Sequence, residues 1–504
     1  MGFNKRLYAI ILICCMMAGV FYVGKSGMQL TEQREREEQE SFLSRKKDTL
    51  QFWYTDESLT DYIEGAAVAF YEKYDVRIEP VLASSQEFLE AVYQASLEED
   101  QAVPDLFLVT NDCLEKAYLS GLASVIEDGG IVNEDNFGAG AENAVTYHDK
   151  LVAYPFYYET SVLLYNATYL MQDAEKHLQA ELDQEAAEES QAQAEAGNVE
   201  EESQGQEEEK VFSEEEIRER MEENLPETIE QLELFADEYD APEQVEGVFR
   251  WDVSDILYNY NFAGNYMSVG GDAGDREELI DIYNLETIQC LNVFQKLNQF
   301  FFIETKDVSY DSVVQDFIDG KIIFTVAGTD ILGKLEAAKA DGTLQYEYGL
   351  REMPELNDTL KSRSRSITTV VAVNGFSEQK KKANQFAKFL TTEYADNIYS
   401  RTGKLPSYRY ANTGVDGAEV FFAEYEDSVP MPKMMEAGNF WIKLEIAFTD
   451  IWEGADVNGT LKALSEEFMT QVTGEPYEEE YIDVPVEEVI EEEYIEESEQ
   501  QDIE

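Results

Sequence analysis

The chain has 504 residues, enough for two lobes with separate cores and some additional segments. Its 106 acidic and 37 basic residues give a formal net charge of -69, which would repel nucleic-acid phosphates, so a nucleic acid is excluded as a partner. Hydrophobic residues make up 44% of the chain, so it is not expected to be disordered as a whole.

The N-terminus carries an apolar run at residues 7–23, which follows two basic residues. The run is typical of a signal sequence and lies near the lower length limit for a membrane span. Because bulky residues stand where a cleavage site needs small ones, residues 1–25 are expected to remain as a signal anchor. Cleavage as a signal peptide and lipidation at Cys15 are the alternatives. Everything after the run then faces outward, beginning with a solvated stalk at 26–47.

Strand and helix patterns alternate in the segment that follows the stalk. The predicted elements are a strand at 50–54, a helix at 59–74, a strand at 76–80, a helix at 85–97 and a strand at 105–109. This order predicts a parallel sheet, and such sheets bind ligands at the carboxyl ends of their strands. The residues just after Trp53 and just after Val109 should therefore lie on one rim.

Two acidic segments depart from this pattern. Residues 173–224 are rich in Glu, Ala and Gln with almost no aromatics, which predicts a disordered or loosely helical insertion. Its end, at 213–216, has the capping-box signal of a helix. Regular patterns then continue to about residue 473. The acidic tail at 475–504 is expected to be flexible and disordered, with a docking or spacing role as the alternative.

Six sequence phrases occur in an order that matches a known family. They lie at 50–54, 104–112 with 119–122, 147–166, 317–328, 382–391 with 403–406, and 430–432 with 440–441. Together they resemble the extracellular solute-binding proteins of the maltose-binding type, the family 1 substrate-binding components of ABC importers. The acidic insertion and tail lie outside this resemblance.

The resemblance implies an α/β protein with the two-lobed periplasmic-binding-protein type II fold, a hinge and an interlobe cleft. The N-terminal lobe is expected to consist of 48–156 and 368–428. The C-terminal lobe is expected to consist of 157–367, which includes the insertion, and 429–474.

The resemblance and the chemistry of the side chains together indicate ligand-binding residues. Sugars stack on aromatic rings and form hydrogen bonds with carboxylates and amides. The candidates are Trp53, Tyr54, Asp56, Asn111, Asp112, Tyr158, Glu159, Trp251, Asp252, Asp330 and Trp441. Asp330 stands near a position where carbohydrate binders commonly have Trp, and Val109 replaces another aromatic. Fewer stacking platforms weaken the case for a maltodextrin.

These features predict an extracytoplasmic receptor that captures a small ligand by hinge closure and delivers it to the permease of an ABC importer. An oligosaccharide is the expected ligand. The alternatives are a cationic solute, favoured by the many carboxylates, and a membrane-anchored surface scaffold or sensor that keeps the fold without transport.

The sequence contains no motif for a nucleophile with its base and no metal-ligand cluster, so neither enzyme activity nor a cofactor nor a metal is expected. The protein should be a monomer at the extracellular face of the cell membrane, held there by its N-terminal segment.

Overall fold

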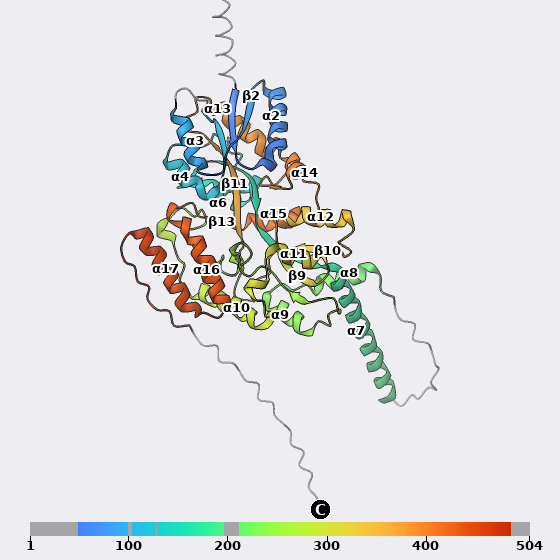
Figure 1. Ribbon diagram of the computed structural model, residues 1–504. Coiled ribbons are helices and arrows are strands. Elements are labelled where there is room, and N and C mark those ends of the chain that lie inside the picture. The colour runs from blue at the N-terminus through green and yellow to red at the C-terminus, as the bar shows by residue number, and fades with distance from the viewer. Residues whose placement is uncertain (1–48, 99–102, 128, 196–210, 485–504) are drawn as a thin grey trace, which may run out of the picture.

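Two lobes lie one above the other in the computed structural model, which describes residues 49–98, 103–127, 129–195 and 211–484 (Figure 1). The first lobe contains a seven-stranded sheet of order β12-β6-β11-β3-β1-β2, with β13 paired to β11. The second lobe contains a four-stranded sheet of order β10-β7-β9-β8. Each sheet has helices packed around it, so the molecule is an α/β protein.

The first sheet contains β1 (Thr49–Tyr54), β2 (Arg77–Leu82), β3 (Leu106–Thr110), β6 (Tyr154–Glu159), β11 (Arg365–Val373), β12 (Leu405–Pro406) and β13 (Val429–Pro430). The second contains β7 (Ser161–Asn166), β8 (Gly247–Phe249), β9 (Ile322–Gly328) and β10 (Tyr348–Arg351). A small separate hairpin consists of β4 (Thr146–Tyr147) and β5 (Lys150–Leu151). Since β1 pairs in parallel with both β2 and β3, the carboxyl ends of these strands lie at one edge, as the sequence predicts.

The helices of the first lobe are α2 (Thr60–Tyr74), α3 (Phe88–Leu97), α4 (Leu114–Leu119), α5 (Glu134–Phe137), α6 (Ala139–Val145), α13 (Lys380–Lys388), α14 (Ile398–Thr402) and α15 (Ala418–Glu426). Those of the second are α7 (Ala167–Glu195), α8 (Glu214–Glu223), α9 (Ile229–Glu238), α10 (Leu285–Phe301), α11 (Tyr310–Ile318), α12 (Ile331–Asp341), α16 (Phe440–Trp452) and α17 (Val457–Thr473). Aromatic rings pack in the core of the first lobe. Phe386 of α13 lies edge-on to Phe52 of β1 and to Phe70 of α2, with ring centres 5.7 and 5.1 Å apart.

The chain crosses between the lobes at neighbouring strands. It leaves the first sheet after Glu159 and enters the second at Ser161, and it returns at Arg365, the first residue of β11. These two crossings and a third, which follows β13, lie side by side because β6 and β13 both pair with β11. The Thr160 hydroxyl donates a hydrogen bond to the Arg365 carbonyl at 2.9 Å. Residues at this junction can therefore respond to the positions of both lobes.

The acidic insertion is more regular than the sequence predicts. Helix α7 projects from the second lobe and packs against α8 (Figure 1), and Arg220 lies 2.6 Å from the Glu181 carboxylate. The capping box predicted at the end of the insertion is present, with Ser213 and Glu216 each bonded to the backbone of the other. Residues 196–210 lie outside the described residues.

The first part of the acidic tail, residues 475–484, is ordered, which corrects the expectation of a disordered tail from residue 475. The Ile482 carbonyl accepts a hydrogen bond from Asn458 at 2.8 Å, and its N–H donates to the Tyr283 hydroxyl at 3.0 Å. Ile482 and Val484 pack against the core of the second lobe. These contacts offset the entropy lost when the segment becomes ordered.

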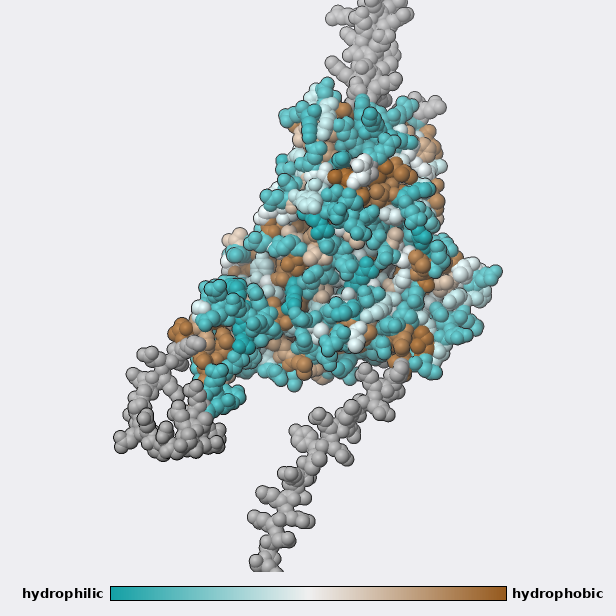
Figure 2. All heavy atoms as spheres, turned by 180° about the vertical axis from the view of Figure 1, so that it is seen from behind, coloured by the Kyte–Doolittle hydropathy of each residue, from teal (hydrophilic) through white to brown (hydrophobic). Residues whose placement is uncertain are grey.

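Hydrophilic side chains cover most of the face seen from behind, in keeping with the acidic composition (Figure 2). Within the described ranges no helix is long and apolar enough to cross a membrane. The predicted anchor and stalk, residues 1–47, lie outside those ranges.

Candidate ligand-binding site

The first lobe contributes a group of charged and aromatic side chains at its edge, Asp56, Tyr157, Glu159 and Lys404, which we call the rim network. Tyr157 and Glu159 are two residues apart on β6, so their side chains share one face of the sheet. The Lys404 ammonium lies 3.1 Å from the Asp56 carboxylate and 4.7 Å from the centre of the Tyr157 ring.

The charges of the rim network stabilise one another. Burial alone would lower the pKa of Lys404, but Tyr157, Asp56 and Glu159 outweigh this effect and the pKa is raised. Burial would raise the pKa of Asp56, but hydrogen bonds from Ser58 and the charge of Lys404 lower it. Both groups of this pair are therefore held in their charged forms.

The second lobe contributes Tyr258, Tyr310, Asp330 and Lys334, which follow or flank the end of β9. The two tyrosine rings are stacked with centres 4.6 Å apart. The Tyr310 hydroxyl donates to Asp330 at 2.6 Å, and Lys334 lies 2.9 Å from the other oxygen of that carboxylate. Burial, followed by the charges of Asp330 and other carboxylates, raises the pKa of Tyr258. The Ser161 hydroxyl, two residues after Glu159, donates to the carbonyl of Leu257, next to Tyr258, at 3.3 Å, so this group adjoins the end of β6.

A third group, Tyr260, Arg365 and Trp441, lies at the junction of the lobes, and we call it the corner cluster. The Arg365 guanidinium lies 4.6 Å from the centre of the Trp441 ring, and the Tyr260 ring meets Trp441 edge-on at 5.5 Å. Burial lowers the pKa of Arg365 to about 10, although three nearby carboxylates oppose this effect. The Trp441 Nε1 and Arg365 Nε atoms are buried and have no hydrogen-bond partner within the described part of the chain.

Five of the eleven predicted ligand-binding residues belong to this interlobe face. Asp56 and Glu159 are in the rim network, Asp330 lies opposite, and Trp441 is in the corner cluster. Asp112 follows β3, is exposed and is close enough for its charge to act on Arg365.

The structure places three of the predicted aromatic residues away from this face. Tyr158 is adjacent to Tyr157 on β6 and so points to the opposite face, where it stacks on Tyr425 at 3.8 Å. Trp251 is completely buried in the core of the second lobe, and its N–H donates to Asn259 at 2.8 Å. Tyr54 is buried and bonded to Thr60.

The other three predicted residues have structural partners. Asn111 is buried and joins two strands of the first lobe, since it donates to the Met431 carbonyl and accepts from the Thr368 N–H. Asp252 accepts hydrogen bonds from the backbone N–H groups of Ser254, Asp255 and Tyr310. The half-buried Trp53 donates to Gln51. The six residues thus have partners within the fold, and a role for them in ligand binding stays a prediction.

Sequence reasoning did not select Tyr157, Lys404 or Arg365. Strand alternation was a usable signal for Tyr157, because a site that includes Glu159 must lie on the Tyr157 face. Lys404 stands in a phrase that carries the family resemblance, but its partner Asp56 is more than 300 residues away. Nothing in the sequence around Arg365 indicates that it lies on a tryptophan ring.

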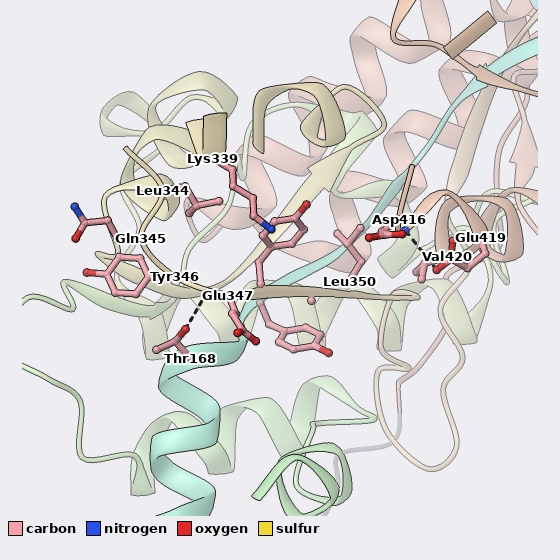
Figure 3. A pocket seen from close by; sticks show the side chains of 14 residues that line it. Thr168, Lys339, Leu344, Gln345, Tyr346, Glu347, Leu350, Asp416, Glu419 and Val420 are labelled. Atoms are coloured by element: carbon pink, nitrogen blue, oxygen red, sulfur yellow. Dashed lines mark hydrogen bonds between the residues drawn. The ribbon is translucent and has the colours of Figure 1, made fainter. Parts of the chain in front are cut away.

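Two of the cavities in the described part of the chain differ in their relation to these groups. One of about 560 Å³ opens at the carboxyl ends of β1 and β3, where Thr55, Thr110 and Cys113 line it. Burial raises the pKa of the Cys113 thiol to about 12, so this cysteine is not a reactive thiolate. The other, of about 750 Å³, lies between β10, the start of α7 and the turn before α15 (Figure 3). It shares no residue with the interlobe face.

The described residues contain no group of three or more His, Cys, Asp or Glu side chains that could hold a metal ion. The chemistry available at the interlobe face is therefore that of carboxylates, cationic donors and aromatic rings. Such a set can bind a polyhydroxylated molecule through hydrogen bonds.

The family model described as bacterial extracellular solute-binding protein matches residues 65–419. No curated protein matches the chain in sequence. The matched family is one of binding proteins, and this confirms the family predicted from the sequence phrases.

Solved structures show the same fold. The extracellular solute-binding protein from Staphylococcus aureus in complex with maltose has a TM-score of 0.65 and 17% identity, over 85% of this chain and 98% of that one. A cyclo/maltodextrin-binding protein complexed with maltotetraose has a TM-score of 0.63 and 20% identity, over 84% and 97%. The maltose-binding periplasmic protein from Listeria monocytogenes has a TM-score of 0.61 and 19% identity, over 86% and 99%. The predicted two-lobed α/β fold is confirmed.

Proposed function

Because the chain belongs to the family of bacterial extracellular solute-binding proteins, we propose that it captures an oligosaccharide between its lobes and delivers it to the permease of an ABC importer. The observation that carries this proposal is the interlobe face. Glu159 ends β6 of the first sheet, and two residues later Ser161 of β7 pairs with Gly328 of β9 and donates to the Leu257 carbonyl of the second lobe at 3.3 Å. A ligand bound there contacts both lobes.

The proposed mechanism is hinge closure around the strands that cross between the lobes. A ligand that touches both lobes binds the closed form more tightly than the open form and so shifts the population toward it. The permease would then recognise the closed form. The similar structures are complexes with maltose and with maltotetraose, which makes α-glucans the first compounds to test.

The side chains of the interlobe face favour an uncharged polar ligand. Carboxylates such as Asp112 and Glu159 accept hydrogen bonds from hydroxyl groups, and cations such as Lys404 donate to them.

The proposal extends to location and partners. Members of this family are extracellular, and the apolar run at residues 7–23 would hold the monomeric protein at the outer face of the membrane. No catalytic step is proposed, since hydrogen bonding and ring contacts at the interlobe face account for capture and release.

The test is calorimetric titration of the full chain with maltose, maltotriose, maltotetraose, a galacturonic acid trimer and spermidine. We expect binding to a neutral oligosaccharide and compaction in small-angle scattering when it is added. If the protein binds spermidine and none of the sugars, the ligand is a cationic solute and the proposal of an oligosaccharide is wrong. Absence of binding to every compound would refute solute capture of these classes, and binding without compaction would refute hinge closure.

A further inference from the structure

Arg365 is a buried cation that has no counter-ion in contact with it. Arg365 is only 5% exposed to solvent. Within the described ranges its guanidinium forms no hydrogen bond or ion pair. Arg363, two residues earlier, forms both a hydrogen bond and an ion pair. The Arg363 Nε donates to the Asp427 carbonyl at 2.6 Å, and its NH1 lies 3.1 Å from Asp272.

The Trp441 ring supports Arg365 and is not free to stack on a sugar with that face. The guanidinium covers one face of the indole at 4.6 Å, and the rings of Tyr260 and Phe440 approach it edge-on at 5.5 and 5.7 Å. The indole N–H is buried and has no hydrogen-bond partner among the described residues. The corner cluster therefore contains two buried hydrogen-bond donors, the Arg365 Nε and the Trp441 Nε1, that have no acceptor within the described part of the chain.

Such an arrangement is unfavourable for stability. Burial of an unpaired guanidinium disfavours its charged form, as the lowered pKa of Arg365 shows. An apolar side chain of similar volume would avoid this penalty. Buried donors without acceptors in a folded protein call for an explanation, and a ligand atom that accepts from them supplies one.

The charges around Arg365 define the chemistry of that ligand. Asp112 of the first lobe and Asp255 and Glu445 of the second act on the guanidinium electrostatically, but none lies within ion-pair distance. A negatively charged ligand would be repelled by these three carboxylates, and a positively charged ligand would be repelled by Arg365. A hydroxyl group fits both, because its oxygen accepts from the guanidinium while its proton is donated to a carboxylate.

We infer that Arg365 is a specificity-determining residue that contacts the ligand. Its guanidinium and the Trp441 N–H donate to a hydroxyl oxygen of a neutral sugar, and Asp112 or Asp255 accepts the proton of that hydroxyl. The inference rests on the proposed function and names the ligand class of the same site as neutral and hydroxyl-bearing.

The test uses Arg365→Met in the full chain, with Arg363→Met as the matched control. Binding of maltotriose and the other compounds of the panel is measured by calorimetry, and stability by urea unfolding without ligand. For Arg365→Met we expect a 10- to 100-fold rise in the Kd of the neutral oligosaccharide, roughly the value of a hydrogen bond to a charged group, with a urea midpoint equal to or above that of the wild type. For Arg363→Met we expect an unchanged Kd and a lower midpoint.

The results separate the two proposals. If the wild type binds a neutral oligosaccharide and Arg365→Met binds it equally well, the inference is overturned while the proposed function stands. A lower urea midpoint for Arg365→Met would identify the arginine as a structural residue and would also overturn the inference. If the wild type binds no neutral sugar, the proposed function fails, and this inference fails with it.

Discussion

The rim network and the corner cluster each place a cation on an aromatic ring, yet they treat the cation in opposite ways. Lys404 lies 4.7 Å from the Tyr157 ring centre and 3.1 Å from Asp56, and its pKa is raised. Arg365 lies 4.6 Å from the Trp441 ring centre with no carboxylate in contact, and its pKa is lowered. Arg365 is the more deeply buried of the two, and burial outweighs the charges around it, whereas Tyr157, Asp56 and Glu159 together outweigh the burial of Lys404.

The same comparison of paired and unpaired donors applies to two tryptophans of the second lobe. Trp251 is fully buried, stacks on Phe249 at 4.3 Å and has its N–H bonded, whereas the Trp441 N–H has no partner among the described residues. We expect Trp251→Ala to lower the free energy of unfolding by about 3–5 kcal/mol, because it leaves a large cavity in the core. Urea unfolding monitored by circular dichroism measures this change.

The control for this prediction is Trp441→Phe, which removes an unpaired donor and keeps an aromatic ring. Its free energy of unfolding should stay within about 1 kcal/mol of the wild type. A larger loss for Trp441→Phe than for Trp251→Ala would contradict the division into a structural and a ligand-facing tryptophan.

Asp252 and Glu159 form a second pair in which one carboxylate is expected to affect stability and the other ligand binding. Asp252 accepts backbone hydrogen bonds from both sides, so Asp252→Asn should lower the free energy of unfolding by about 1–3 kcal/mol. Glu159→Gln should leave stability nearly unchanged and raise the Kd for the bound oligosaccharide, because the carboxylate faces the interlobe site. Calorimetry and urea unfolding of both variants check this pair, and weaker binding by Asp252→Asn alone would reverse the assignment.

A second buried basic residue, Lys433, makes stability depend on pH. Its ammonium donates to the carbonyls of Asn143 in the first lobe and Ala273 in the second, and burial lowers its pKa to about 7, although Asp275 opposes this. Between pH 7 and the ordinary lysine value, the unfolded chain binds a proton that the folded chain does not. The free energy of unfolding should therefore rise with pH, by about 1.4 kcal/mol per unit at most, and fall as the pH returns to 7.

Urea unfolding at pH 8 and pH 9 measures this contribution of Lys433. The rise between the two should be smaller in Lys433→Met by up to about 1.4 kcal/mol, since methionine does not titrate. Equal slopes in the wild type and the variant would show that Lys433 keeps its proton in the folded state.

The smallest expected effect concerns the rim network. Lys404→Met removes an ion pair that is partly exposed, with side-chain exposures of 22% for Lys404 and 36% for Asp56, and it also removes the contact with the Tyr157 ring. We expect a loss of stability of about 1 kcal/mol, which becomes smaller in high salt. A gain in stability, as expected for Arg365→Met, would abolish the contrast between the two cations.

Local pattern predicted the features that depend on neighbouring residues. The alternation of strands and helices up to residue 110 predicted the parallel order of β1, β2 and β3 and the edge at which Asp56 and Asp112 lie. The capping box at Ser213 was readable because both of its bonds join residues three positions apart. The family phrases predicted the two lobes, and the match of residues 65–419 confirms the family.

Local pattern could not decide which side of a strand faces the ligand. Tyr157 and Tyr158 have the same side chain, and alternation says only that they point in opposite directions. Tyr158 is covered because α15 places Tyr425 against it at 3.8 Å, and α15 lies more than 250 residues later in the chain. The choice of face therefore depends on a helix that packs from elsewhere in the sequence.

The sequence by itself determined the family, because its phrases lie within short segments, and the two-lobed fold followed from that resemblance. Periodicity within short segments determined which acidic side chains follow the strands. Only the tertiary structure decided which charges are paired. Lys404 meets Asp56 and Arg365 meets Trp441 across long separations in the chain, and the contacts of each cation determine whether it stabilises the fold or remains available for a ligand.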